Sequence, residues 1–150
     1  MSLHSYSRCW IHLTWATLRR ERVLPKPAAI EVSGFLSDHA KRKGIYMAIN
    51  YVNPEHVHAL VDLPTAYSVE QVMKLLKGAS SHWINQNRVI RGRFRWGRGY
   101  GAFSVSHSRL NEVARYIADQ EEHHRKRTFI EEYSKLMQAH DLKWSEDDFE

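Results

Sequence analysis

The order of strand-like and helix-like segments constrains the fold of this chain more than any other feature of its sequence. Residues 6–17 are rich in aromatic and β-branched side chains and lack helical periodicity, which predicts a first strand. Residues 45–52 and 56–63 have the same character and are joined by an Asn-Pro turn short enough for a hairpin. A short run at 102–106 is also strand-like. The sequence therefore predicts four strands, the second and third of which form a hairpin.

Segments with helical periodicity lie between and after these strands. Apolar residues recur at helical spacing over 28–43, and Ser68 and Gln71 form a capping box at the start of a second periodic segment. After the fourth strand, Ser108 is positioned to cap a third helix, and a last helical segment is predicted over 129–140. The order is βαββαβ followed by C-terminal helices. This is the ferredoxin-like arrangement of an α+β protein, in which two helices cover one face of an antiparallel sheet, and it hosts many unrelated functions.

The composition indicates one globular domain spanning 1–150. The chain is 43% hydrophobic and 26% charged, the ordinary balance of a domain that buries a core. No apolar run approaches the ~20 residues needed to cross a bilayer, so no membrane partner is expected. The single cysteine, Cys9, cannot form an internal disulfide, and no charged and then apolar leader opens the sequence. We therefore expect a cytoplasmic protein.

Positive charge indicates a polyanionic partner, because the chain carries a formal net charge of +5. Arginines are concentrated in residues 88–98, the arginine loop, with Phe94 and Trp96 between them. Arginines bind phosphates and aromatic rings stack on unpaired bases, a combination typical of single-stranded nucleic acid binding. The alternative is a solvated basic loop with both rings in the core. The residues predicted to bind DNA are Arg19, Arg20, Lys74, Lys77, Arg88, Arg91, Arg93, Arg95 and Arg98.

The first candidates for chemistry are His56 and His58. They stand two apart on a predicted strand, so both side chains project from one face while Val57 points to the other. Two adjacent imidazoles can share one divalent metal ion. Alone, a His-X-His pair is a weak signal, because strand histidines more often bond to solvent or to neighbours.

The second candidates, Tyr116 and Gln120, are four residues apart on the predicted third helix and share a face. His123 and Arg127 extend the same row, which a purely structural helix could also carry as its boundary with solvent. Together with the histidines, the row offers what phosphodiester transfer through tyrosine needs: a nucleophile, a metal that polarises the phosphate, and cations that hold the strand. Because the pKa of tyrosine is ordinarily ~10, the metal or the cations should help to form the phenolate.

A family resemblance is carried by the segments NPEHVHALVDLP, YSVEQVMKLLKGASSHWIN, GYGAFSVS and VARYIADQEEHHRKR. They resemble the single-tyrosine HUH transposases of the insertion-sequence-200-like type, over roughly residues 5–142. The combination of HVH with YIADQ is far more specific than either motif alone.

The resemblance implies a role for each candidate. His56 and His58 would bind Mg²⁺ or Mn²⁺, Gln120 would complete the metal site, and Tyr116 would be the nucleophile of a 5′-phosphotyrosine intermediate. Members of the family are homodimers that act on single-stranded DNA with hairpins near the element ends. The tyrosine helix of one subunit can lie against the HUH pair of the other through a flexible link. The corresponding link here, 106–108, contains no glycine.

Three other interpretations stay open. A domesticated relative would process palindromic repeats of its host by the same chemistry, and genomic context would separate the two. A non-catalytic single-stranded nucleic-acid-binding module would share the strand order, but 99–103 lacks most of the aromatic pattern of RNA-recognition domains. A zinc-dependent hydrolase would use both histidines, but no glutamate stands at the helical spacing of a general base, although Glu55 and Asp62 are nearby.

Overall fold

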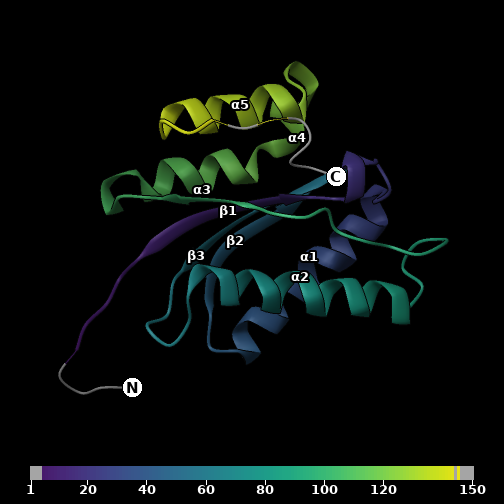
Figure 1. The fold of residues 1–150 in the computed structure, drawn as a ribbon, viewed down its shortest axis with the longest axis horizontal. Helices are drawn as coiled ribbons and strands as arrows, with labels where there is room; N and C mark the ends of the chain where they lie inside the picture. Colours follow the sequence, from purple (N-terminus) through teal and green to yellow (C-terminus); the bar gives the residue numbers. More distant parts are fainter. Residues whose placement is uncertain (1–4, 144, 146–150) are drawn as a thin grey trace.

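A four-stranded antiparallel sheet lies at the centre of the molecule (Figure 1). The computed structural model describes residues 5–143 and 145. The strands follow the order β2-β3-β1-β4, and each pairing is antiparallel. They are β1 (Trp10–Ala16), β2 (Tyr46–Val52), β3 (His56–Asp62) and β4 (Gly101–Ser104). This topology confirms the predicted ferredoxin-like α+β fold.

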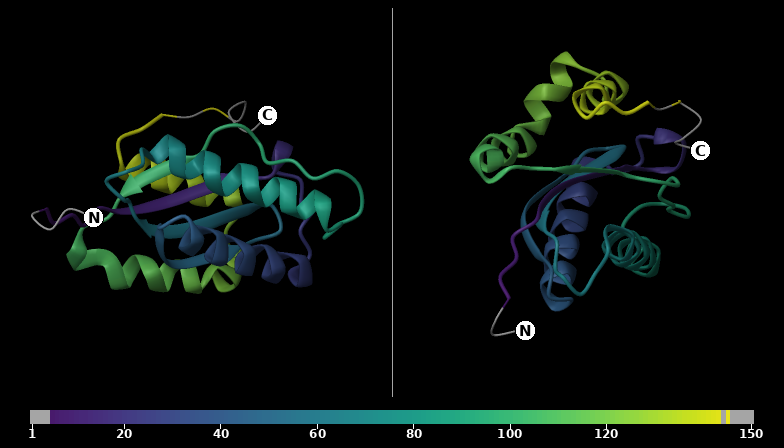
Figure 2. Two further views of the ribbon diagram at one scale, coloured as in Figure 1. Left: turned by 90° about the horizontal axis from the view of Figure 1, so that it is seen from below. Right: turned by 60° about the vertical axis from the view of Figure 1, so that its left-hand side comes forward.

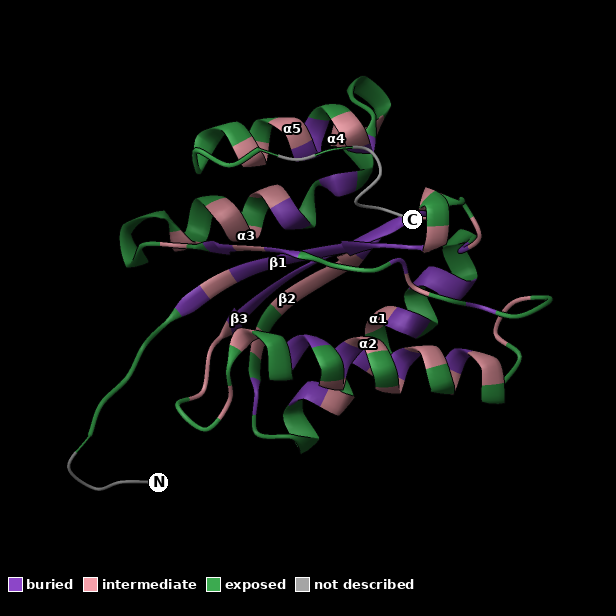
Figure 3. Ribbon diagram, viewed as in Figure 1, coloured by how far each residue is buried: buried purple, intermediate pink, exposed green. Residues whose placement is uncertain are grey.

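The two central strands, β1 and β3, are the most deeply buried part of the sheet (Figure 3). Every residue of β3 except Asp62 is buried, and so is every residue of β1 except Ile11. Successive side chains of a strand point to opposite faces, so both faces of these strands must be covered. The register places His58 opposite Thr14 of β1 and opposite Tyr51 of β2.

One face of the sheet packs against α1 (Lys26–Arg42) and α2 (Val69–Gln86). Both helices present an apolar stripe to the sheet, as their periodicity predicts. The main hydrophobic core lies in this layer and includes Leu13, Trp15, Val32, Leu36, Val57, Val61, Val72 and Leu76.

The opposite face is covered by α3 (Leu110–Ala118), α4 (Gln120–Lys126) and α5 (Phe129–Ala139). The sheet therefore lies between two helical layers, which Figure 2 shows from two further sides. Ile117 of α3 packs on Trp10 and Leu60, and α5 forms a smaller cluster with Ala16. Side chains on this face of β3 consequently point into a buried layer.

All four strands are shorter than their sequence patterns predict, and the largest differences are at the start of β1 and the end of β4. The first strand begins at Trp10 rather than at residue 6, since Trp10 pairs with Asp62, the last residue of β3. The fourth strand ends at Ser104 rather than at residue 106, and Ser104 is opposite Ile11 near the start of β1.

The helix starts agree with the sequence in one case and differ in another. The capping box of Ser68 and Gln71 is confirmed, with both reciprocal hydrogen bonds present. Ser108, in contrast, does not cap α3: it lies in a 3₁₀ turn, His107–Arg109, and α3 follows at Leu110 without a side-chain cap. Among the described residues, no helix combines the length and the apolarity that a bilayer crossing requires.

Candidate active site

His56 and His58 lie side by side on β3, in the layer between the sheet and the C-terminal helices. The solvent-exposed fraction of each is 0%, whereas the intervening Val57 points into the main core. The predicted placement of the two rings on one face of a strand is therefore confirmed. Because α3, α4 and α5 cover this face, the rings are enclosed rather than open to solvent.

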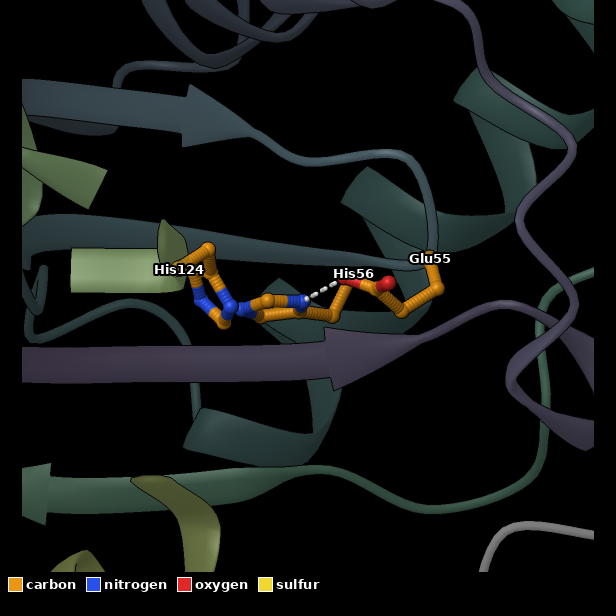
Figure 4. A group of neighbouring side chains, drawn as sticks. All are labelled: Glu55, His56 and His124. Atoms are coloured by element: carbon orange, nitrogen blue, oxygen red, sulfur yellow. Dashed lines mark hydrogen bonds and ion pairs between the residues drawn. The ribbon is translucent and has the colours of Figure 1, made fainter. Parts of the chain in front are cut away.

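Each imidazole is held through its Nδ1 atom. Figure 4 shows the contact between His56 and Glu55, in which His56 Nδ1 lies 2.7 Å from Glu55 Oε1. The other oxygen of Glu55 accepts a hydrogen bond from Arg22 at 2.6 Å. His58 Nδ1 lies 2.8 Å from His12 Nε2 on β1. A hydrogen-bonded Nδ1 fixes the orientation of a histidine ring and leaves its Nε2 atom to face a ligand. Both Nε2 atoms are thus presented to the same side.

The side chain that meets both Nε2 atoms is Glu132 of α5. Its Oε1 atom lies 2.7 Å from His58 Nε2 and 3.2 Å from His56 Nε2. These ligand-type atoms of the three buried residues all lie within 4.8 Å of one another. Sequence reasoning did not single out Glu132. The sequence offers only a weak signal for Glu132. It stands three residues after Phe129 and directly before Tyr133, so an acidic side chain borders the apolar face of the predicted helix.

Tyr116 of α3 reaches the same carboxylate from the other side. Its hydroxyl donates a short hydrogen bond to Glu132 Oε2, and its ring centroid is 5.8 Å from that of His58. Glu132 thus bridges the tyrosine and the histidine pair within one chain. The two motifs identified in the sequence are therefore brought together, although 60 or so residues separate them along the chain.

Gln120 is fully buried next to Tyr116. Its Nε2 atom donates to Glu132 Oε2 at 3.2 Å, and its Oε1 atom accepts from Asn53 Nδ2 at 3.2 Å. The Oε1 atom also lies 3.1 Å from His124 Nε2. The amide thus contacts the glutamate through its nitrogen.

The row predicted on one continuous helix is broken in the structure. Asp119 lies between α3 and α4, with a backbone conformation that departs from the helical one. His123 still packs on Tyr116, at 4.8 Å between ring centroids, but Arg127 is extended and lies beyond the end of α4. His124, which the row did not include, faces the site instead, 4.7 Å from the His56 ring.

Burial affects the pKa of the three histidines that lie on the strands, His12, His56 and His58. It lowers the pKa of His58 to about 4 and that of His12 to about 3, so both rings are neutral near pH 7. Burial also opposes protonation of His56, but hydrogen bonds to Glu132 and Glu55 outweigh it and raise the pKa of His56 above its usual value. The His56 ring is therefore the most basic of the three.

Glu132 and Tyr116 shift in opposite directions. Burial acts to raise the pKa of Glu132, but hydrogen bonds with His124, His56 and His58 outweigh it and hold that pKa far below its usual range. Burial, followed by the negative charge of Glu132, raises the pKa of Tyr116 well above its usual value. Glu132 is therefore ionised, and it keeps the proton on Tyr116.

The arginine loop follows α2, and its two aromatic rings do not lie where the sequence pattern favoured them. Phe94 is 1% exposed in the main core, and Trp96 packs edge-on against Trp15 at 5.8 Å and donates to Ser80 Oγ at 2.9 Å. Stacking of Phe94 on an unpaired base is therefore the wrong interpretation, because its ring is enclosed in the core. The structure matches the alternative, a basic loop whose rings pack on the core, although Trp96 is only partly buried there.

Other predicted DNA-binding residues surround this loop. The turn formed by Arg19 and Arg20 adopts a left-handed backbone, and the preceding Leu18 N–H donates to Arg95 O at 3.0 Å. Lys77 donates to two carbonyl oxygens, of Gly97 at 2.8 Å and of Gly99 at 2.9 Å, so its ammonium group anchors the end of the loop. Contact of these cations with DNA remains a prediction.

Comparison with known proteins agrees with this geometry. A family model described as "Transposase IS200 like" matches residues 5–120. The chain belongs to the IS200-like transposase family. This IS200-like transposase carries both histidines, Tyr116 and Gln120 inside the matched stretch, whereas Glu132 follows it.

Individual relatives and solved structures support the same family. The transposase is 27% identical to the ISDra2 transposase TnpA of Deinococcus radiodurans over 114 residues, which cover 73% of this chain and 81% of that relative. The crystal structure of a candidate transposase from Deinococcus radiodurans R1 matches with a TM-score of 0.64 and 26% identity, covering 80% of this chain and 96% of the other. A REP-associated tyrosine transposase bound to a REP hairpin matches in fold, with a TM-score of 0.59 and 16% identity, over 83% and 74% of the two chains.

Proposed function

We propose that this IS200-like transposase cuts and rejoins single-stranded DNA through a covalent 5′-phosphotyrosine bond at Tyr116, in a reaction that depends on Mg²⁺ or Mn²⁺. One observation carries the proposal: the Tyr116 hydroxyl and both histidine Nε2 atoms converge on the two oxygens of a single carboxylate, Glu132. An ion held by the histidine pair at this point would therefore lie beside the Tyr116 hydroxyl.

The proposed cleavage step transfers the DNA strand to the protein. The Tyr116 oxygen forms a bond to phosphorus, and the bond from phosphorus to the 3′ oxygen of the preceding nucleotide breaks. The phenolic proton is released to water, and the departing 3′ oxygen takes up a proton from water. The phosphotyrosine ester keeps the bond energy. A 3′ hydroxyl of another strand can therefore reverse the step without ATP.

The residues of the site fit a divalent metal. Two imidazoles with their Nε2 atoms presented to one side and one ionised carboxylate form a compact donor set, the kind that Mn²⁺ and related ions accept. When bound, such an ion polarises a phosphate oxygen. Its charge would also offset that of Glu132, which otherwise keeps the proton on Tyr116.

The family and its relatives support a proposal for the substrate and the assembly. A relative of the same fold binds a REP hairpin, and we propose single-stranded DNA with hairpins as the partner of this chain. The homodimer implied by the family resemblance stays a prediction. Tyr116 already lies beside the histidines of its own chain, so an exchanged tyrosine helix is not needed to bring them together. We expect action in the cytoplasm, where the exposed Cys9 would stay reduced.

Covalent trapping tests this function. The protein is incubated with labelled single strands from both flanks of its gene and Mn²⁺, and the products are separated on a denaturing gel. We expect a labelled protein adduct. Tyr116→Phe keeps the ring and its packing but lacks the attacking oxygen, so it should form no adduct while its affinity for the same strands is unchanged.

Tyr100→Phe is the matched control, because Tyr100 is exposed and lies outside the site. This variant should form as much adduct as the wild type. An adduct that persists in Tyr116→Phe would place the nucleophile elsewhere. A stable complex without any adduct in the wild-type protein would instead favour a non-catalytic binding module.

A further inference from the structure

The position of Glu132 Oε1 matches that of a ligand to a six-coordinate metal ion. With metal–ligand bonds of about 2.1 Å, donors in neighbouring octahedral positions are about 3 Å apart. Glu132 Oε1 lies 2.7 Å from His58 Nε2 and 3.2 Å from His56 Nε2. These two separations bracket the expected one. Both separations therefore fit neighbouring ligands of one ion, and the three ligand atoms all lie within 4.8 Å of one another.

The surroundings of the two histidines favour this geometry. The Nδ1 atom of His56 is bound to Glu55, and that of His58 to His12, so neither ring can turn without losing a buried contact. Such partners fix which nitrogen faces a metal. The two Nε2 atoms therefore stay directed at the point that Glu132 Oε1 occupies.

The contacts of Gln120 indicate a role other than that of a metal ligand. Its Oε1 atom, the only one that could bind a cation, accepts a hydrogen bond from Asn53 and lies beside His124. Its Nε2 atom donates to Glu132 Oε2 at 3.2 Å. The amide thus orients the carboxylate by holding the oxygen that faces away from the histidines.

We propose that Glu132 is the third protein ligand of the metal and that Gln120 acts as its positioning residue. This assignment rests on the proposed metal-dependent function. A carboxylate also suits Mg²⁺ and Mn²⁺ better than a neutral amide, because it is a charged, hard oxygen donor. The sequence expectation that Gln120 completes the metal site is thereby replaced.

The assignment makes metal binding depend on α5, one of the three helices that cover this face of the sheet (Figure 1). Phe129, the first residue of α5, stacks on the His56 ring with 4.2 Å between centroids. Tyr133 packs on Phe129 in the same small cluster. These contacts place Glu132 over the histidines. The third ligand therefore comes from a segment that follows the stretch matched by the family model.

Titration of the full-length protein with MnCl₂ tests the assignment without DNA. Free Mn²⁺ is followed by its electron paramagnetic resonance signal, and thermal unfolding with and without Mn²⁺ gives a second readout. Glu132→Gln retains the shape of the side chain but removes its charge. We expect it to weaken Mn²⁺ binding at least about tenfold and to abolish the metal-dependent rise in Tm.

Glu131→Gln is the matched control, because Glu131 is the exposed neighbour on the same helix and loses the same charge. It should bind Mn²⁺ like the wild type. Gln120→Ala should weaken binding less than Glu132→Gln does. Wild-type affinity in Glu132→Gln, or a larger loss in Gln120→Ala, would overturn the assignment. If Glu132→Gln does not fold, Glu132→Asp replaces it, and its shorter carboxylate should bind Mn²⁺ more weakly than the wild type.

The result is separable from that of covalent trapping. Mn²⁺ binding that depends on Glu132, in a protein that forms no DNA adduct, would leave the ligand assignment standing and refute the proposed function. Conversely, if the wild-type protein forms the adduct and Glu132→Gln binds Mn²⁺ normally, the proposed function stands and the ligand assignment is refuted.

Discussion

At the scale of single residues, the site depends on imidazoles that stay neutral in a buried layer. His12 and His58 lie on neighbouring strands and share a hydrogen bond of 2.8 Å. Burial lowers the pKa of His12 to about 3 and that of His58 to about 4. An unfolded chain would protonate both rings near the ordinary value of 6.5. The folded state therefore binds fewer protons than the unfolded one over the interval between these values.

This difference predicts that the metal-free protein loses stability as the pH falls below about 6.5. His12 alone should lower the free energy of unfolding by about 1.4 kcal/mol per pH unit, or about 3 kcal/mol by pH 4. His12→Gln removes the titrating ring. Its Tm, measured in chelator from pH 7 to pH 4, should therefore fall less steeply than that of the wild type.

The exposed His82 provides the control for this measurement, since its ring keeps its contact with water on folding. His82→Gln should follow the wild-type curve. Parallel curves for His12→Gln and the wild type would show that His12 does not resist protonation in the folded state.

At the scale of elements, a break between two short helices decides what faces the site. A continuous helix would keep Tyr116, Gln120, His123 and Arg127 in one row. In the structure α3 ends at Ala118, Asp119 has a non-helical backbone and α4 begins at Gln120, and His124 of α4 faces the histidine pair. The predicted row is therefore correct up to His123 and wrong at Arg127.

The start of α2 offers a test of local helix stabilisation. Ser68 Oγ accepts the Gln71 N–H at 3.1 Å, and the Gln71 side chain accepts the Ser68 N–H at 2.8 Å. Ser68→Ala leaves one N–H of the first turn without its partner, so it should lower the free energy of unfolding by about 1 kcal/mol. Chemical denaturation measures the change. Ser81→Ala, in the interior of the same helix, should be neutral or slightly stabilising, and an equal loss in both variants would contradict a capping role.

At the scale of the whole molecule, charge should guide the DNA. The net charge is +5, and the arginine loop and the Arg19–Arg20 turn lie next to each other through the backbone contact of Leu18 with Arg95. Phosphate contacts release counterions, so the logarithm of the affinity for single strands should fall linearly with the logarithm of the salt concentration.

Removal of two loop arginines should make this dependence shallower. Each phosphate contact contributes a slope of about −0.7 for single strands, so the double variant Arg93→Ala and Arg95→Ala should reduce the slope by about 1.4. Fluorescence anisotropy at several salt concentrations gives the value. Lys41→Ala with Arg42→Ala, at the end of α1, removes the same charge elsewhere and should change the slope less. An unchanged slope in the loop variant would exclude the arginine loop from the DNA path.

The sequence by itself determined the order of the elements and the faces on which several site residues lie. The element order follows from local periodicity, and the two-residue spacing of His56 and His58 puts both on one face of β3 with Val57 on the other. These features depend only on neighbours in sequence. The same holds for the capping box and for the shared face of Tyr116 and Gln120.

Only the tertiary structure decided which side chains complete the site. Glu132 meets His56 across 76 positions of sequence, and His12 meets His58 across 46. No local pattern specifies such contacts, because they arise from the packing of α5 and β1 against β3. Packing of the main core on the other face of the sheet buries Phe94 and partly buries Trp96, two rings that the sequence alone could equally have placed against DNA. The residue type shows that a side chain could bind a base or a metal. Whether it can do so in the folded protein depends on whether tertiary packing leaves it accessible.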